Sequence, residues 1–234
     1  ILGNPNNPTG NLFPPEDLLD LAEGARARGA RLAVDEAFVD LAAPRGAGPG
    51  ALSLAVRAAA TDGLLVLGSM TKLFAVPGLR LGFVVGAPRV VERIRDARPP
   101  WSVSSLAEEA ALAALAQRDY VRRGIDLVAR ERGRLFRGLV GLPGLRPYPP
   151  SANFVLVDCR GTGVPAHALR DALGPRGILI RDCRSFEGLD RFYFRVAVKT
   201  AAENRRLLAA LREALAALRP SAGRGVEGDG ASGR

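Results

Sequence analysis

Lys72 lies in the stretch SMTKLF (Ser69 to Phe74) and is unusual because only two of the chain's 33 basic residues are lysines, Lys72 and Lys199. A primary amine forms a Schiff base with an aldehyde, whereas a guanidinium does not in practice. Most lysines are only solvated charges, so Lys72 by itself does not indicate a nucleophile. Whether Lys72 is a nucleophile or only a solvated charge depends on which residues lie near it in the fold.

Four more polar residues supply the groups that a phosphorylated pyridine aldehyde requires. The ring nitrogen requires a carboxylate to keep it protonated, and Asp35 offers one. The phosphate requires hydroxyls, amides and arginine, and Ser69 and Arg80 offer two of these groups. The phenolic oxygen requires a donor, and Asn7 offers an amide. Together with Lys72 for the aldehyde, this set predicts a pyridoxal 5'-phosphate site.

Helices that alternate with short apolar strands position these residues and indicate an α/β protein. The predicted helices cover residues 18–28, 89–95, 105–116 and 119–140, a segment near His167, and residues 200–218. The predicted strands cover residues 1–3, 31–35, 64–69, 79–86, 153–158, 177–182 and 192–198. Capping boxes at Ser105 with Glu108, and at Thr200 with Glu203, predict where two of the helices begin.

Asn7, Asp35 and Ser69 each follow the carboxyl end of a predicted strand. In an open parallel sheet, a ligand binds beyond the carboxyl ends of the strands. We therefore expect these three side chains to converge on one site at that edge of the sheet.

The composition narrows the class of protein. A hydrophobic content of 47% without any run long enough to span a bilayer predicts a cytoplasmic protein with no membrane partner. Two cysteines and one histidine give neither a disulfide framework nor a metal site. The net charge of +9 comes from arginines scattered over the predicted helices, so we expect no nucleic-acid partner.

Five motifs carry a resemblance to a known family. They are NPNNPTG (Asn4–Gly10), DEAF (Asp35–Phe38), SMTK (Ser69–Lys72), GLRLGF (Gly78–Phe83) and FRVAV (Phe194–Val198). Their order and spacing resemble those of fold-type I pyridoxal-phosphate enzymes of the class I/II aminotransferase superfamily, over about residues 1–218. Five motifs in order are far more specific than any single one.

The resemblance implies a role for each residue of the predicted cofactor site. Lys72 resembles the lysine that takes the aldehyde, and Asp35 the aspartate that pairs with the ring nitrogen; these two are the expected catalytic residues. Asn7 resembles the donor to the phenolic oxygen. Ser69 and Arg80 resemble the residues that hold the phosphate.

The resemblance also implies a substrate site. Arg195 resembles the arginine that binds the substrate carboxylate as a bidentate pair. Arg181, fourteen residues earlier on the preceding strand-like segment, is the second expected anchor. Asn7 is expected to border the same space, and the implied substrate is a small phosphorylated amino acid.

Two subgroups of the superfamily compete. Phe38 stands where the family often has Tyr, and the segment Gly177–Thr200 resembles that of threonine-phosphate decarboxylases. This implies decarboxylation of L-threonine O-3-phosphate to (R)-1-aminopropan-2-yl phosphate, for cobalamin biosynthesis. The alternative is a histidinol-phosphate aminotransferase or another class I/II aminotransferase.

The implied architecture is a three-layer large domain of the PLP-transferase type, with a mostly parallel sheet, followed by a small α+β C-terminal domain. The expected divisions are residues 1–100 for the C-terminal part of the large domain, 101–140 for bridging helices, 141–219 for the small domain and 220–234 for a disordered tail. The family also implies a homodimer.

The opening ILGNPNNPTG lacks an initiator Met and reads as the end of a strand. We therefore expect an N-terminally truncated chain that is not a competent enzyme by itself. A function of a different class also stays open: an inactive fragment, or an aminotransferase-like sensor domain fused to a DNA-binding segment. The sequence upstream would distinguish these alternatives.

Overall fold

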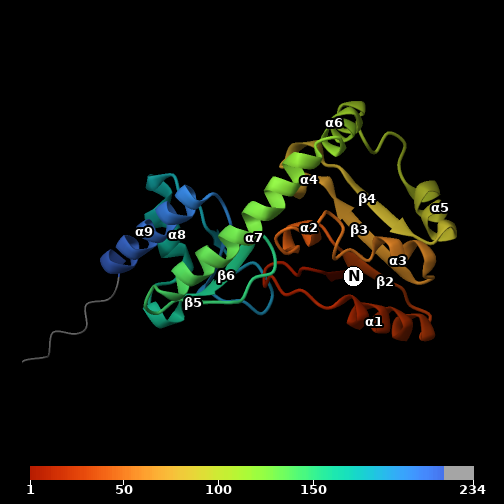
Figure 1. Cartoon of the computed structure of the whole chain (residues 1–234). Coiled ribbons are helices and arrows are strands. Elements are labelled where there is room, and N and C mark those ends of the chain that lie inside the picture. The colour runs from red at the N-terminus through yellow and green to blue at the C-terminus, as the bar shows by residue number, and fades with distance from the viewer. Residues whose placement is uncertain (219–234) are drawn as a thin grey trace, which may run out of the picture.

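The structure, a computed structural model, describes residues 1–218, and in this part of the chain a long helix joins two four-stranded sheets (Figure 1). Sheet A has the order β1 (Leu2–Gly3), β2 (Leu32–Asp35), β3 (Leu64–Ser69) and β4 (Gly82–Gly86). Strands β1, β2 and β3 are parallel, whereas β4 is antiparallel to β3. Between β3 and β4 the chain turns back through residues 70–81, and the Met70 amide donates to the Leu81 carbonyl at 3.2 Å.

Helices α1 (Pro15–Ala27) and α3 (Ala55–Ala60) pack on sheet A, because both present apolar residues to its strands. The shared core consists of Leu18, Ala22, Leu32, Val34, Leu54, Ala58, Leu64 and Val66. Three short elements, α2 (Val39–Ala42), α4 (Met70–Leu73) and a 3₁₀ turn (Pro77–Leu79), follow the ends of β2 and β3. Helices α5 (Pro88–Ala97) and α6 (Ser105–Leu115) come after β4.

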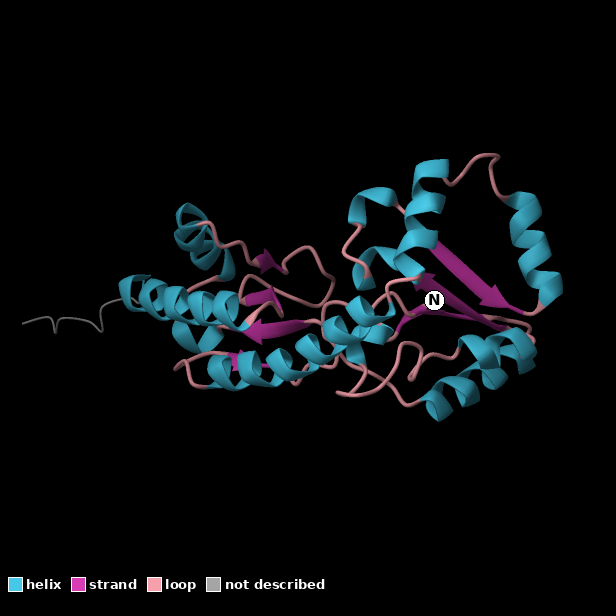
Figure 2. Cartoon of the chain, turned by 45° about the horizontal axis from the view of Figure 1, so that its top comes forward, coloured by secondary structure: helices cyan, strands magenta, loops and turns pink. Residues whose placement is uncertain are grey.

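Helix α7 (Arg118–Val140) runs from sheet A to the second sheet (Figure 2). It contacts α2 at one end and β5, β6 and α9 at the other. Its buried apolar residues recur at helical spacing, as expected for an amphipathic helix. They are Val121, Ile125, Val128, Leu135 and Leu139.

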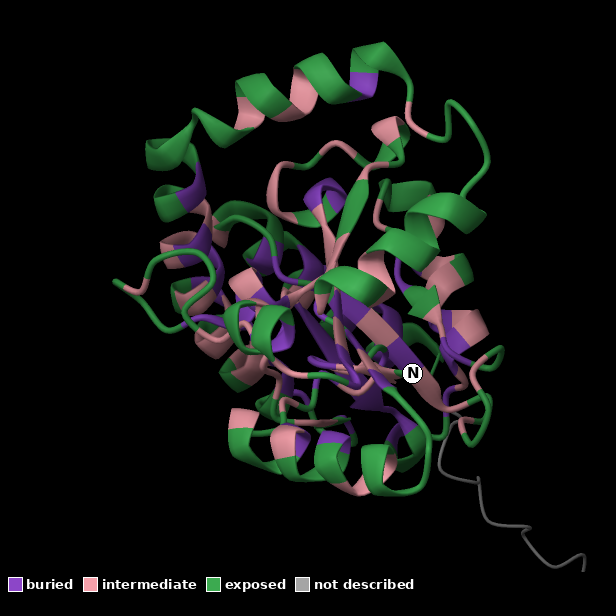
Figure 3. Ribbon diagram, turned by 90° about the vertical axis from the view of Figure 1, so that its right-hand side faces the viewer, coloured by how far each residue is buried: buried purple, intermediate pink, exposed green. Residues whose placement is uncertain are grey.

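Sheet B is antiparallel throughout and has the order β5, β6, β8, β7. Its strands are β5 (Arg146–Pro147), β6 (Phe154–Asp158), β7 (Arg181–Asp182) and β8 (Tyr193–Ala197), with 3₁₀ turns at Arg160–Thr162 and Gly174–Arg176. Helices α8 (Ala166–Leu173) and α9 (Ala201–Leu218) contact each other and enclose a large apolar core with the sheet. Figure 3 shows buried residues concentrated in the interior of the molecule and exposed residues on the outer helices.

The predicted α/β class and mainly parallel first sheet are confirmed. We propose that residues 1–100 form part of the large domain, 101–140 the bridging helices and 141–219 the small domain. The predicted disordered tail, 220–234, lies outside the described residues. The Thr200 capping box is confirmed: Thr200 Oγ1 accepts from the Glu203 amide at 3.4 Å, and Glu203 Oε2 accepts from the Thr200 amide at 3.2 Å. The box at Ser105 is wrong by one residue: Ser104 caps α6, and its Oγ accepts from the Ala107 amide at 3.2 Å.

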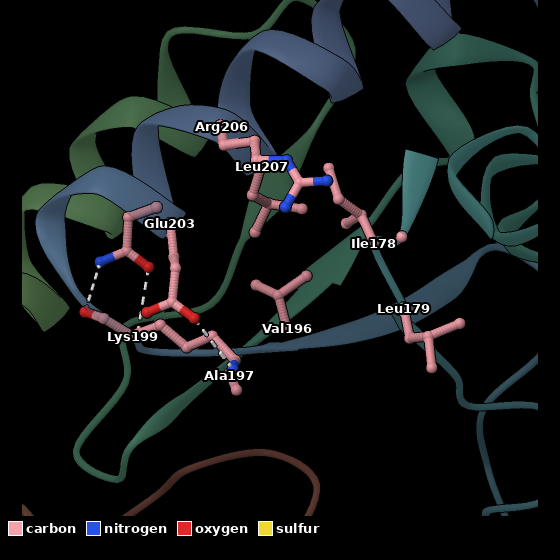
Figure 4. A pocket seen from close by; sticks show the side chains of 10 residues that line it. Ile178, Leu179, Val196, Ala197, Lys199, Glu203, Arg206 and Leu207 are labelled. Carbon is pink, nitrogen blue, oxygen red and sulfur yellow. Dashed lines mark hydrogen bonds and ion pairs between the residues drawn. The ribbon is translucent and has the colours of Figure 1, made fainter. Parts of the chain in front are cut away.

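The strand predicted at residues 177–182 is also shorter than expected. Only Arg181 and Asp182 pair with β8. Ile178 and Leu179 lie across a cavity of about 270 Å³ from Val196 on β8 (Figure 4). This separation leaves the first half of the segment without ladder hydrogen bonds.

Candidate active site

The carboxyl ends of the parallel strands meet at one edge of sheet A. The register pairs Gly3 with Asp35 and Asp35 with Leu67, so β1, β2 and β3 end side by side. Asp35 and Ser69 therefore end their strands at the same edge of the sheet, and Asn7 follows the end of β1 by four residues.

Asp35 and Lys72 are both exposed at this edge. Asp35 Oδ1 accepts a hydrogen bond from the Ala37 amide at 2.9 Å, which fixes the carboxylate at the end of β2. Lys72 extends from α4, with Nζ 5.6 Å from the ring centroid of Phe38. Within residues 1–218, neither side chain forms an ion pair with another residue. Both charges are thus available to a ligand.

Ser69 and Arg80 lie on neighbouring segments. Within residues 1–218, no hydrogen bond joins their side chains. Ser69 Oγ accepts from the Thr71 amide at 3.3 Å and is 2.8 Å from Thr71 Oγ1. The Arg80 backbone is left-handed (φ 50°), and its guanidinium donates to the Pro77 carbonyl at 2.7 Å. Ser69 pairs with Gly82, and Arg80 lies two residues before Gly82 in the segment that leads into β4.

Arg181 and Arg195 are direct cross-strand partners in β7 and β8. Opposed residues in a ladder project from the same face, so both guanidinium groups belong to one surface. Arg181 is exposed and donates to Ser185 Oγ at 3.0 Å. Arg195 is half-buried and donates to Asn7 Oδ1, which joins sheet B to the loop after β1. Burial, followed by the nearby Arg181 charge, lowers the pKa of Arg195, and Cys183 opposes that effect.

Phe154 is a residue of this region that the sequence reading missed. Its ring meets the Phe38 ring edge-on at a centroid distance of 5.2 Å. The Arg195 Cζ lies 4.7 Å from the centroid of the same ring. Only its position at the start of a predicted strand could have drawn attention to it. The two rings thus connect Lys72 on sheet A with Arg195 on sheet B.

Glu36, next to Asp35, is a second residue whose role could not be predicted from the sequence. It is buried and accepts hydrogen bonds from Ser53 Oγ and from the Leu54 amide, the latter at 2.8 Å. Burial raises the pKa of its carboxyl group, although both hydrogen bonds oppose this shift. Glu36 therefore ties the start of α3 to the turn that carries Asp35.

The cysteines have no nucleophilic character at neutral pH. Burial raises the pKa of the Cys183 thiol to about 11, although the charges of Arg195 and Arg181 act to lower it. Burial raises the pKa of Cys159 to about 12. A thiol is a nucleophile only as its thiolate, so neither cysteine is a candidate nucleophile.

The donor set at the sheet edge fits pyridoxal phosphate by its chemistry: an amine, a carboxylate, a hydroxyl, a guanidinium and an amide. Within residues 1–218, no three His, Cys, Asp or Glu residues gather as metal ligands. The same part of the chain has no helix with the length and apolar character needed to cross a membrane.

The chain matches known sequences over most of its length. The family model "Aminotransferase class I and II" matches residues 1–211. A histidinol-phosphate aminotransferase from Methanothermobacter thermautotrophicus is 35% identical over 91% of this chain and 54% of the relative. A threonine-phosphate decarboxylase from Salmonella typhimurium is 36% identical over 94% of this chain and 58% of the relative. The chain thus spans a little over half the length of these curated relatives.

A solved structure agrees with these matches. The histidinol-phosphate aminotransferase of Sinorhizobium meliloti, solved with pyridoxal-5'-phosphate, has a TM-score of 0.77 and 30% identity, covering 93% of this chain and 58% of that one. The family and this neighbour indicate pyridoxal 5'-phosphate as the cofactor. The chain belongs to the class I and II aminotransferase family.

Proposed function

We propose that the protein is a pyridoxal-phosphate enzyme that decarboxylates L-threonine O-3-phosphate. When bound, the cofactor supplies an electron sink for bonds broken at the substrate's α-carbon. Lys72 would hold the cofactor through its amine and carry a proton on Nζ to and from the α-carbon. Asp35 would keep the ring nitrogen protonated, because an exposed carboxylate without an ion pair in residues 1–218 can accept that partner.

The remaining residues of the site would bind and orient. Asn7 would donate its side-chain amide to the phenolic oxygen, while its Oδ1 already accepts from Arg195. Ser69 and Arg80 would hold the cofactor phosphate. Asn7 would therefore border both the cofactor and the substrate.

The pair of arginines on sheet B carries the choice of substrate. Arg181 and Arg195 are opposed in the ladder and project from one face. Two guanidinium groups on one face suit a ligand with two anionic groups, since each can form charge-assisted hydrogen bonds. L-Threonine O-3-phosphate carries a carboxylate and a phosphate on one small molecule, whereas histidinol phosphate carries a phosphate and no carboxylate.

Phe38 and the segment around Cys183 also favour the decarboxylase by resemblance, and the Salmonella relative supports this choice. The second candidate is a histidinol-phosphate aminotransferase, which the Methanothermobacter relative favours. In that case the arginines would bind a phosphate in one half-reaction and a dicarboxylate in the other. An aminotransferase-like sensor is the alternative of another class.

The test is a direct comparison of the two reactions with the protein at its natural length. Carbon dioxide release from L-threonine O-3-phosphate is measured beside amino transfer from histidinol phosphate to 2-oxoglutarate. We expect decarboxylation without transfer. Transfer without decarboxylation would favour the second candidate, and neither reaction with tightly bound cofactor would favour the sensor.

We also propose a cytoplasmic location and a homodimer, both on the basis of the family. Sedimentation of the natural-length protein tests the second proposal directly. A monomer at micromolar concentration would contradict it.

A further inference from the structure

We propose that Phe154 is a positioning residue that orients the Arg195 guanidinium toward a substrate carboxylate; the inference rests on the role proposed above for Arg195. Phe154 begins β6 and is only 4% exposed. Leu156 pairs with Arg195, so Phe154 is the diagonal neighbour of Arg195 on the same face of sheet B. The Arg195 Cζ lies 4.7 Å from its ring centroid, within the range of a cation–π contact.

An aromatic ring holds a guanidinium without using its hydrogen-bond donors. Among the described residues, Arg195 pairs with no carboxylate, and its side-chain partners are the neutral Asn7 Oδ1 and the Phe154 ring. A carboxylate in place of the ring would compete with the substrate for the same donors. The ring attracts the cation electrostatically and leaves its charge free for an incoming anion.

Phe154 also fixes the distance between the two halves of the site. Its ring meets Phe38 at 5.2 Å and an interplanar angle of 86°, and Lys72 Nζ lies 5.6 Å from the Phe38 centroid. An amino acid carries its amine and carboxylate on one carbon, so the groups that receive them must keep a constant separation. The Phe38–Phe154 contact supplies that separation across the two sheets.

The loop after β1 passes close to the ring. Gly10 has a positive φ of 77°, and a Cβ at this position would lie 3.8 Å from Phe154 Cε2. The Gly10 carbonyl accepts from the Ser151 amide at 3.0 Å, which holds the loop after β1 close to the ring. The loop after β1 therefore lies beside the ring, which also contacts Phe38.

The test compares Phe154→Met with Phe154→Tyr in the natural-length protein loaded with pyridoxamine phosphate, which has no aldehyde to react with the ligand's amine, so that the ligand is not turned over during the measurement. Met keeps a similar volume but has no ring, whereas Tyr restores the ring. Phe192→Met is the matched control, because the Phe192 ring lies against Arg160 and Arg191 instead. Thermal melting establishes that each variant is folded. Calorimetric titration with L-threonine O-3-phosphate and with its decarboxylated amine, 1-aminopropan-2-yl phosphate, then measures binding.

We expect Phe154→Met to weaken binding of the carboxylate ligand by about three- to thirtyfold, the range of a cation–π contact, and to leave the amine within about twofold. Phe154→Tyr and Phe192→Met should bind both ligands as the wild type does. Equal weakening of both ligands by Phe154→Met, or no weakening, would overturn the inference alone. A wild-type protein that binds neither ligand would overturn the proposed function and the inference with it.

Discussion

Arg132 of α7 is the side chain whose removal tests most directly how the two sheets are held together. Its Nη1 donates to the Leu41 carbonyl at 2.9 Å and to the Ser151 carbonyl at 2.5 Å. Leu41 lies in α2 beside sheet A, and Ser151 precedes β6 of sheet B. Burial lowers the pKa of Arg132, yet a guanidinium stays protonated at neutral pH. One cation thus binds carbonyls from both halves of the molecule.

Arg132→Met keeps an unbranched apolar stem and removes the charged donors. Hydrogen bonds from charged groups contribute about 1.5–3 kcal/mol each, so two of them set an upper range of about 3–6 kcal/mol. Arg132 is half-buried, so water can reach part of the site and satisfy the freed carbonyls in part. We therefore expect the free energy of unfolding to fall by about 2–4 kcal/mol.

Urea unfolding of the natural-length protein, followed by circular dichroism, measures this loss. The control is Arg123→Met, an identical change at an exposed position of α7, which should alter stability by no more than about 0.5 kcal/mol. Equal stability of the two variants would refute the reasoning, since the carbonyl contacts would then not hold the sheets together.

Three further predictions use the site and its supports. Asp35→Asn should lower kcat by at least about a hundredfold at saturating cofactor, because the ring nitrogen loses its anionic partner; unchanged turnover would exclude that role. Gly68→Ala would place a Cβ 2.1 Å from the Phe83 ring, so we expect a loss of about 1–2 kcal/mol in thermal melting, and none for Gly78→Ala, where a Cβ meets no atom within 4 Å. Both cysteine thiols, with pKa values raised to about 12 and 11, stay protonated at pH 8 and should react with a disulfide reagent only after unfolding; rapid labelling of the native protein would contradict their burial.

The edge of sheet A could be predicted because it depends on local signals. Each of Asn7, Asp35 and Ser69 follows a short apolar run, and parallel strands place such residues at one edge. The sequence predicts Arg181 and Arg195 as two anchors on successive segments. It does not predict that they are direct cross-strand partners, which only the structure shows.

The contacts between the sheets could not be predicted from the sequence. Phe38 and Phe154, or Arg132 and Leu41, lie far apart in the chain, and no local pattern encodes their approach. Phe154 reads as an ordinary core residue of a strand, and Arg132 as one of many arginines on a helix. Both gain their significance from the way α7 brings the two sheets together.

Two predictions, the cap of α6 and the strand at residues 177–182, differ from the structure for local reasons. Ser104 and Ser105 are adjacent serines before α6, and either could cap it; the hydrogen bond from the Ala107 amide selects Ser104. The apolar residues 178–180 have the composition of a strand, but of this segment only Arg181 and Asp182 pair with β8, and Ile178 and Leu179 line a cavity together with Val196. Strand propensity indicates which residues suit a sheet, while partners decide whether they join it.

The central claim is that Lys72 is the residue that binds the cofactor, and the chain permits a clean test because it has only two lysines. The natural-length protein is incubated with pyridoxal phosphate, reduced with borohydride and mapped by mass spectrometry of its peptides. We expect a pyridoxyl group on Lys72, retained in Lys199→Ala and lost in Lys72→Ala. A label on Lys199 of the wild type, or cofactor that binds and leaves Lys72 unlabelled, would contradict it.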